Sequence, residues 1–244
     1  MIDLYYAATP NGQKLKLFFE ETGLPHRVIR VSLGKGEQFA PEFQAISPNS
    51  KIPALVDHDP ADGGPPLTLF ESGAMLHYLA EKSGRFIAPD PRGRLETLAW
   101  LFWQTSGLGP LAGQAGHFRA HAPEPIPYAI DRYTKEVARL FGVLDRRLAD
   151  RDFIVGDYSI ADMAAYPWVV PHEGLGQALD DFPNLQRWFR SIAARPATVR
   201  AYEGVTSPYD KGRKPMTEAE RDVLFGRTAP KAGPAANPPR LRRR

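Results

Sequence analysis

Apolar and polar residues alternate along the first third of the chain in a way that predicts both strands and helices. Short runs rich in β-branched and aromatic residues predict four strands, at 2–6, 27–33, 53–57 and 67–70. Apolar residues at helical spacing predict two helices, at 13–22 and 72–82, which end at Gly23 and Gly84. The order of strand, helix, strand, a connection, two strands and a helix is that of a thioredoxin-like α/β fold.

Beyond a linker at 85–91 the strand pattern stops and helical periodicity takes over. Apolar residues keep to one helical face from Ile130 to Leu148, and the stripe returns from Leu185 to Ile192. We therefore expect an α/β domain at 1–84 and an all-α domain at 92–205. An extension at 206–228, with a possible short capped helix after Thr217, follows. Its composition predicts that the segment 229–244 is a disordered basic tail.

Two motifs in the helical part suggest little chemistry. Ser159 and Asp162 predict a helix start in which each side chain bonds the other's backbone amide, with Asp in the usual place of Glu or Gln. His117 and His121 have a four-residue spacing, but the nearby Gly, Ala and Pro argue against a firm helix, and no third ligand is adjacent. We expect no metal site.

The charge of the chain is concentrated at one end. The formal net charge is +3, but residues 206–244 hold ten Lys or Arg against four Asp or Glu, which leaves −3 for residues 1–205. A nucleic-acid partner therefore has little support in the folded part. The first residues lack the basic start and apolar stretch of a secretory signal, and no run approaches the roughly 18 apolar residues of a membrane span. We expect a cytoplasmic protein without a membrane partner.

The chain contains no cysteine. It can therefore form no disulfide, hold no metal through a thiolate and use no thiol of its own as a nucleophile. If the protein performs thiol–disulfide chemistry, every sulfur atom must come from its ligands.

Two dipeptides of the α/β part together suit a bound peptide. A cis bond between Ile52 and Pro53, which costs only about 0.5–1 kcal/mol, would turn the Ile52 backbone outward as an edge for pairing. Glu71 would supply a carboxylate for an ammonium group, and Ser72 a helix N-terminus for a carboxylate. Each dipeptide alone is more often a turn or a helix cap, but together they predict a glutathione site.

Further segments extend this pattern over residues 1 to about 205. The segments are 8–14, 33–39, 46–49 and 62–64 in the α/β part, and 100–104 and 126–133 in the helical part. With them the chain resembles the cytosolic glutathione transferase superfamily, and within it the Nu class. That class includes bacterial glutathione-dependent disulfide-bond oxidoreductases and is related to a fungal nitrogen-catabolite regulator. One departure is Ser50, which stands where such relatives often have Gly.

The resemblance implies roles for residues near the thiol of glutathione. Thr9 and Asn11 would face the sulfur just before the first helix, where a hydroxyl, an amide and the helix dipole favour a thiolate over a thiol. The alternative for both residues is a helix cap, since Thr-Pro-Asn-Gly is also a good start signal.

The resemblance also implies roles along the rest of the tripeptide. Gln38 would reach the glycine end with Lys51 as a weaker candidate, and Ile52 beside Pro53 would pair through its backbone. Glu71 and Ser72 would bind the γ-glutamyl group. A further residue is Arg132, for a carboxylate of a second glutathione or an acidic group nearby. Its alternative is a surface ion pair with Asp131 or Glu136.

The predicted activity is glutathione-dependent disulfide reduction. One or two glutathione molecules per subunit would supply the thiolates, and a small disulfide would be the substrate. Two alternatives stay open: a transferase that conjugates glutathione to electrophiles, and a glutathione-binding regulatory protein without catalysis. The resemblance further implies a symmetric homodimer.

Overall fold

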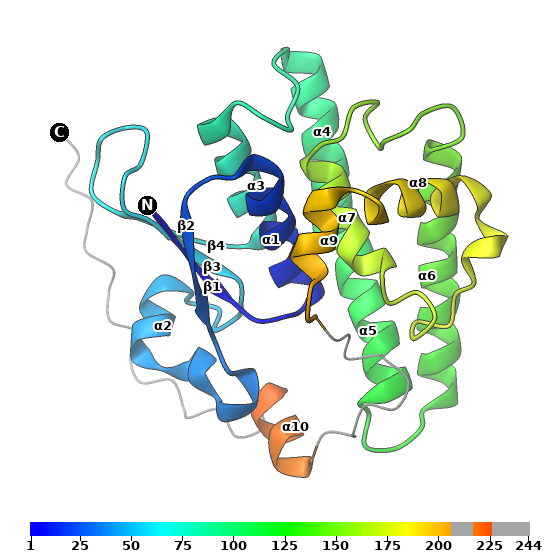
Figure 1. The fold of residues 1–244 in the computed structure, drawn as a ribbon. Helices are drawn as coiled ribbons and strands as arrows, with labels where there is room; N and C mark the ends of the chain where they lie inside the picture. The colour runs from blue at the N-terminus through cyan, green and yellow to red at the C-terminus, as the bar shows by residue number, and fades with distance from the viewer. Residues whose placement is uncertain (206–216, 226–244) are drawn as a thin grey trace. The chain divides into compact units, whose positions relative to one another are not determined.

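The computed structural model describes residues 1–205 and 217–225, which divide into two compact units (Figure 1). Unit 1 contains Met1–Ala7, His26–Glu71 and the helix α10 (Glu218–Leu224). Unit 2 contains Ala8–Pro25 and residues 72–205. The domain boundaries expected from the sequence remain a prediction, and the basic segment 229–244 lies outside the described residues.

Unit 1 is built on a mixed four-stranded sheet with the order β2-β1-β3-β4. The strands are β1 (Ile2–Tyr6), β2 (His26–Arg30), β3 (Ala54–Asp57) and β4 (Leu67–Phe70). Strand β1 runs parallel to β2 and antiparallel to β3, and β3 runs antiparallel to β4. This pairing confirms the predicted strands, with one correction: β2 ends at Arg30 and does not reach residue 33.

The chain leaves β2 early because it turns into two short 3-10 helices. These are η1 (Leu33–Lys35) and η2 (Glu37–Phe39), separated by Gly36, whose φ of 75° is left-handed. Helix α2 (Pro41–Ile46) follows. Its Phe43 forms a buried cluster with Val31 and Ala54, and Ile52 packs against this cluster. Apolar packing thus fixes the segment that leads from β2 to β3.

Helix α10 covers the first of these 3-10 helices and is drawn in orange in Figure 1. A Cβ atom added to Gly36 would lie 3.4 Å from Val223 Cγ1. The helix begins with the predicted capping box, in which Thr217 Oγ1 accepts from the Glu220 backbone and the Glu220 carboxylate accepts from the Thr217 N–H at 2.8 Å. Residues far apart in sequence therefore build unit 1 together.

The described part of unit 2 is helical, and most of its helices start with the same residue type. They are α1 (Pro10–Thr22), α3 (Ser72–Ser83), α4 (Pro91–Trp103), α5 (Gly109–Ala120), α6 (Pro127–Arg147), α7 (Ile160–Val169), α8 (Pro183–Ala193) and α9 (Pro196–Tyr202). Five of them begin with proline, whose fixed φ suits a first helical position and whose missing N–H is not needed there. A π-helical stretch, η3 (Gln104–Leu108), joins α4 to α5.

Helix α1 packs against α7 and α9, and the face that the sequence predicts to be apolar is buried. Leu15, Phe18 and Phe19 are buried. The helix ends at Gly23, as predicted, which adopts a φ of 69° and donates its N–H to Phe19 at 2.8 Å. Helix α6 likewise buries Val137 and later members of its apolar stripe, but Ile130 near its start is only half-buried.

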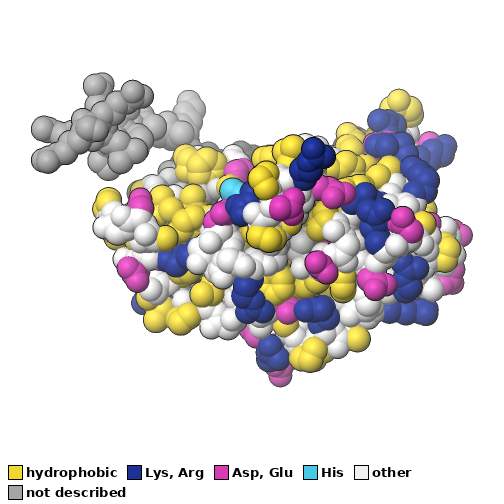
Figure 2. Space-filling model, turned by 90° about the horizontal axis from the view of Figure 1, so that it is seen from above, with side chains coloured by type: hydrophobic (Ala, Val, Ile, Leu, Met, Phe, Trp, Pro, Cys, Tyr) yellow, Lys and Arg dark blue, Asp and Glu magenta, His cyan; other side chains and the backbone are white. Residues whose placement is uncertain are grey.

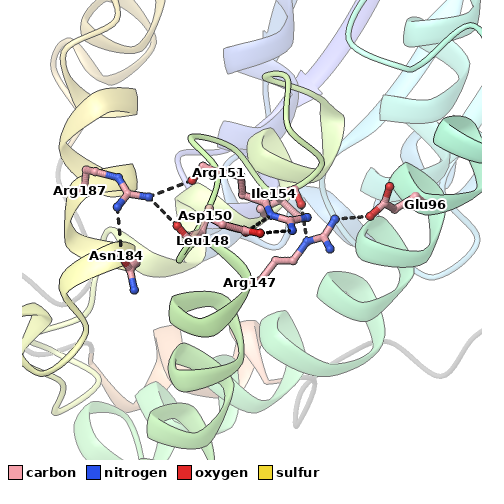
Figure 3. A network of polar contacts seen from close by, with 8 residues as sticks. All are labelled: Glu96, Arg147, Leu148, Asp150, Arg151, Ile154, Asn184 and Arg187. Carbon is pink, nitrogen blue, oxygen red and sulfur yellow. Dashed lines mark hydrogen bonds and ion pairs between the residues drawn. The ribbon is translucent and has the colours of Figure 1, made fainter.

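A polar network holds the loop that follows α6 (Figure 3). Arg147 donates to the Ile154 carbonyl at 2.6 Å and pairs with Glu96 of α4. Arg187 of α8 donates to the carbonyls of Leu148 and Arg151, at 2.5 and 2.9 Å. These bonds satisfy the Leu148 carbonyl at the end of α6, which has no intrahelical partner, and two carbonyls of the loop that follows.

The predicted capping box at the start of α7 is confirmed, and it is buried. The Asp162 carboxylate accepts from the backbone N–H groups of Ser159 and Ile154 and from Trp188 Nε1 at 2.8 Å. Burial raises the pKa of Asp162 to about 6, although these hydrogen bonds oppose the shift. Its hydrogen bonds to two backbone amides and to the Trp188 side chain agree with a role in folding.

The surface shows no single dominant sign of charge in the view of Figure 2. Lys and Arg side chains are intermingled with Asp and Glu side chains over the described residues of that face. Within residues 1–205 and 217–225, none of the helices combines the length and the apolar character that crossing a membrane requires.

Candidate functional site

Thr9 caps helix α1. Its Oγ1 accepts a hydrogen bond from the Gly12 N–H at 3.2 Å. The cap alternative is therefore realised, but it does not compete with a role toward a ligand. A hydroxyl that accepts a bond through its oxygen still has its own proton to donate. Thr9 can thus cap the helix and donate to a thiolate at the same time.

Asn11, in the first turn of α1, is bonded by an indole from α7. Trp168 Nε1 donates to Asn11 Oδ1 at 3.1 Å. Because an indole nitrogen can only donate, the amide atom that faces it is the carbonyl oxygen. The NH₂ end of Asn11 is then directed away from the indole. Trp168 belongs to none of the motifs that the sequence shows.

Ser72 begins α3 and lies beside a buried cation. Lys14 Nζ donates to Ser72 Oγ at 3.1 Å and to Gln104 Oε1 at 2.6 Å. All three side chains are buried, with Lys14 only 1% exposed. Because Ser72 accepts from the ammonium group, its hydroxyl proton is available to an acceptor such as a carboxylate. A positive charge and a donor are therefore placed together at the start of α3.

One feature of the sequence points to this cluster. Lys14 stands four residues before Phe18, so it shares the face of α1 that packs inside the protein. A charged residue on a buried helical face needs a polar partner. Gln104 gives no comparable signal, and its Nε2 is buried without a hydrogen-bond partner among the described residues.

The loop before β3 has the predicted backbone form. The Ile52–Pro53 bond is cis. Ile52 stands outside the ladder, since β3 begins at Ala54. The Lys51 side chain is exposed, while its carbonyl accepts from Ser47 Oγ at 2.9 Å. Ser50 has a φ of 52°, a left-handed conformation that glycine adopts more readily than serine.

Gln38 and Glu71 are two further predicted residues of unit 1. Gln38 lies in η2 and is only 3% exposed, yet its Oε1 has no hydrogen-bond partner among the described residues. Glu71 is exposed, follows β4 directly and has a φ of 71°. A positive φ is uncommon outside glycine and marks a position that its surroundings hold in place. Glu71 forms no ion pair within the described part of unit 1.

Arg132 lies in the second turn of α6, and its guanidinium is only loosely paired. Its Nη1 approaches Glu136 Oε2 at 3.5 Å, whereas Arg139 holds the same carboxylate through two bonds of 2.7 and 3.0 Å. The hydrogen bond from Arg139 is the main cause that lowers the pKa of Glu136. Asp131 pairs with Lys135 instead. The ion-pair alternative thus holds for Glu136, through a single long contact.

The histidine pair does not form a metal cluster. His117 lies inside α5, which runs unbroken to Ala120, so the expectation of a poor helix there was wrong. His121 caps the end of the helix. Nowhere in the described ranges do three His, Asp or Glu side chains come together in a group that could hold a metal ion.

The predicted site residues fall into both units. Thr9, Asn11, Ser72 and Arg132 belong to unit 2, and Gln38, Lys51, Ile52, Pro53 and Glu71 belong to unit 1. Glu71 and Ser72 are consecutive residues, so the backbone joins the two sets at that point. In unit 2 the structure adds Lys14, Gln104 and Trp168 to them.

Comparison with known proteins decides the family. The family model described as glutathione S-transferase, N-terminal domain, matches residues 8–82, and the model of the C-terminal domain matches residues 110–196. Disulfide-bond oxidoreductase YfcG of Escherichia coli (strain K12) is 55% identical over 202 residues, which are 82% of this chain and 94% of that protein. The chain belongs to the glutathione S-transferase family.

Solved structures of similar proteins contain glutathione. A glutathione transferase from Burkholderia graminis with two glutathione molecules bound per subunit has a TM-score of 0.79 and 44% identity over 85% of this chain and 88% of that one. A glutathione transferase from Pseudomonas putida with one glutathione disulfide per subunit has a TM-score of 0.77 and 41% identity, over 85% and 91%. The chain has the glutathione transferase fold, with a thioredoxin-like N-terminal domain and a helical C-terminal domain, as predicted.

Proposed function

We propose that this protein is an enzyme that reduces disulfide bonds with glutathione. The observation that carries the proposal is the absence of cysteine in a chain 55% identical to a disulfide-bond oxidoreductase along 94% of that protein's length. The reacting sulfur atoms must then all belong to glutathione and to the substrate. The protein holds the reacting groups in position, which removes much of the entropic barrier to exchange. It also supplies charge.

The reaction uses two glutathione molecules and balances without another reductant. The first thiolate attacks one sulfur of the substrate, the substrate S–S bond breaks, and the departing sulfur takes a proton. The second thiolate attacks the glutathione sulfur of the mixed disulfide, forms glutathione disulfide and releases the other substrate thiol. The Burkholderia graminis and Pseudomonas putida structures, with two glutathiones and with glutathione disulfide, support a site that accepts both states.

The side chains at the start of α1 suit stabilisation of the first thiolate. Thr9 donates its hydroxyl proton and Asn11 its NH₂ group toward the sulfur, near the positive end of the helix dipole. Each donor favours the thiolate over the thiol. This lowers the pKa of bound glutathione toward neutral pH, where more of it is reactive.

The other predicted residues hold the rest of the tripeptide. Ser72, assisted by Lys14, binds the γ-glutamyl carboxylate, and Glu71 binds its ammonium group. The Ile52 backbone, beside Pro53, pairs with the cysteinyl backbone. The remaining contacts go to carboxylates: Gln38 and Lys51 bind the glycine end, and Arg132, which makes one long contact to Glu136, binds a second glutathione. We also propose a symmetric homodimer.

The transferase alternative has less support in the structure. The tyrosines nearest to Thr9 in the sequence are Tyr5 and Tyr6, which belong to β1. Tyr6 is buried, and the ring centroids of Tyr5 and Phe43 lie 5.9 Å apart. Thr9 is the only hydroxyl in the segment 7–12. Deleting residues 229–244 tests the regulatory alternative, because an enzyme of the proposed kind should keep its turnover without that segment.

The experiment that tests the proposal measures formation of glutathione disulfide with a small disulfide substrate, beside conjugation of an aryl halide at the same glutathione concentration. We expect disulfide reduction to dominate and to fall at least tenfold in Asn11→Ala and Glu71→Ala. Glu124→Ala, which removes an exposed carboxylate from the loop before α6, is the matched control and should be unchanged. Dominant conjugation, or unchanged reduction in both site variants, would overturn the proposal.

A further inference from the structure

Trp168 connects α7 to the start of α1 through a single polar contact. It lies near the C-terminal end of α7, directly after Pro167, and is half-buried. Helices α1 and α7 pack against each other, and the indole N–H reaches Asn11 Oδ1 at 3.1 Å. The two residues are separated by 157 positions in the sequence.

The indole ring of Trp168 lies against two glycines of α5. Gly109 and Gly113 stand one turn apart on that helix, on the side that faces Trp168. A Cβ atom at Gly113 would lie 3.5 Å from Trp168 Cη2, and one at Gly109 would lie 3.3 Å from Nε1 and 2.8 Å from Gln104 Nε2. A Cβ atom at Gly109 would therefore crowd Gln104 and the indole nitrogen, whereas one at Gly113 would only touch the ring. Close packing on the α5 backbone keeps the indole N–H directed at Asn11.

The bond matters because the two ends of a carboxamide act oppositely on an anion. The NH₂ end attracts a thiolate, and the carbonyl end repels it. The two ends are similar in shape, so packing alone does not choose between them. The indole N–H does choose. A reversed amide would place two donors against each other and lose the hydrogen bond.

We infer that Trp168 is a positioning residue, which holds the Asn11 carboxamide so that its NH₂ group faces the sulfur of glutathione. The inference rests on the proposed function, since it needs a thiolate at Asn11. Trp168 acts through Asn11 and does not itself have to touch glutathione. It fixes which end of the Asn11 carboxamide faces the sulfur, which a freely rotating side chain would leave undetermined.

Trp168→Phe tests the inference, because it keeps an aromatic ring against the α5 glycines and removes the N–H. We expect the pKa of bound glutathione, followed by thiolate absorbance, to rise. At neutral pH kcat should fall about fivefold or more, while KM for glutathione changes less than twofold. In an Asn11→Ala background the same substitution should have no further effect, because the residue through which it acts is gone.

Two controls separate a positioning role from a general loss of packing. Trp103→Phe alters a half-buried indole whose ring centroid lies 5.2 Å from that of Trp100. This variant should leave the pKa of the bound glutathione thiol unchanged. In proteins that keep Trp168, the ¹⁵N-labelled indole resonance of Trp168 should shift between the parent and Asn11→Ala, since the acceptor of its N–H is lost. This second measurement remains informative if Trp168→Phe folds poorly.

The outcomes distinguish this inference from the proposed function. If Trp168→Phe shifts the thiol pKa equally with and without Asn11, or if the indole resonance ignores Asn11→Ala, Trp168 does not act through Asn11 and the inference is wrong. If Asn11→Ala itself leaves turnover and the thiol pKa unchanged, the proposed site at α1 fails as well.

Discussion

The Lys14 ammonium group donates a hydrogen bond to Ser72 Oγ at 3.1 Å inside unit 2. A residue that the family resemblance assigns to glutathione is thereby oriented by a buried cation from another helix. The same ammonium group donates to Gln104 Oε1 at 2.6 Å, so it connects α1, α3 and the π-helical stretch η3. The carboxylate site that we propose at Ser72 is thus set by packing within unit 2 as well as by its own helix.

Replacing Lys14 with Met should weaken glutathione binding. Methionine keeps much of the apolar length of the side chain but removes the positive charge and the donors to Ser72. We expect the dissociation constant for glutathione, measured by calorimetry, to rise about tenfold, which corresponds to about 1.4 kcal/mol. Lys16→Met, two residues away on α1 and paired with Glu20, is the control. Equal affinity in Lys14→Met and the parent would contradict this role.

Removal of Arg132 should affect glutathione far more than removal of Arg139. Both arginines contact Glu136, but Arg139 makes the two shorter bonds, so Arg132 keeps donors for a ligand carboxylate. We expect Arg132→Ala to raise KM for glutathione about tenfold, which Arg132→Lys should not restore because an ammonium cannot bind bidentately. Arg139→Ala should change KM less than twofold. Similar effects of the two alanine variants would mean that the helix surface, and not a ligand contact, is responsible.

Thr9→Asp can separate helix capping from thiolate stabilisation. Aspartate still accepts the Gly12 N–H, so the free energy of unfolding in urea should stay within about 0.5 kcal/mol of the parent. Its charge repels a thiolate, so the pKa of bound glutathione should rise and turnover should fall. Thr9→Ala should instead lose about 1 kcal/mol of stability through the missing cap. Full activity in Thr9→Asp would leave Thr9 with the cap alone.

The pH dependence of stability should reveal the buried carboxyl of Asp162. Its pKa is raised from 3.8 to about 6, so the folded state binds this proton more tightly than the unfolded state does. Its contribution is therefore fully present below about pH 4 and is lost as the pH rises through 6, a change of roughly 3 kcal/mol.

The comparison with Asp162→Asn isolates this contribution from those of other carboxylates. The variant should be less stable by about 2–4 kcal/mol at neutral pH, because its NH₂ group would face N–H groups that need an acceptor. The difference in unfolding free energy between parent and variant should shrink as the pH rises from 4 to 6. A difference that is constant over this range would show that Asp162 does not titrate there.

The sequence predicted the elements with clear periodicity and lost accuracy where tertiary contacts decide. Strand β4 and helix α3 have the expected starts, and the capping box of Asp162 follows from local spacing alone. The strand predicted to reach residue 33 stops at Arg30, and the chain continues into the 3-10 helix η1, which α10 covers.

The candidate site was predicted in part for a similar reason. Family resemblance points to residues that would touch glutathione, such as Asn11 and Ser72. It does not reveal Lys14 or Trp168, which act on those residues. Lys14 meets Gln104 across 90 positions and Trp168 meets Asn11 across 157, and no local pattern contains such distances. Only the packing of α1 on its neighbours brings these pairs together.

Unit 1 is discontinuous in the sequence, and this bears on how the protein is made. The 3-10 helix at Leu33–Lys35, just before Gln38, receives its cover from α10, which lies almost two hundred residues later. During synthesis the sheet strands emerge first, and domains generally fold in that order. The segment before Gln38 can therefore adopt its final surroundings only after residues 218–224 have been synthesised and have left the ribosome. The strands of unit 1 emerge long before the helix that completes their unit.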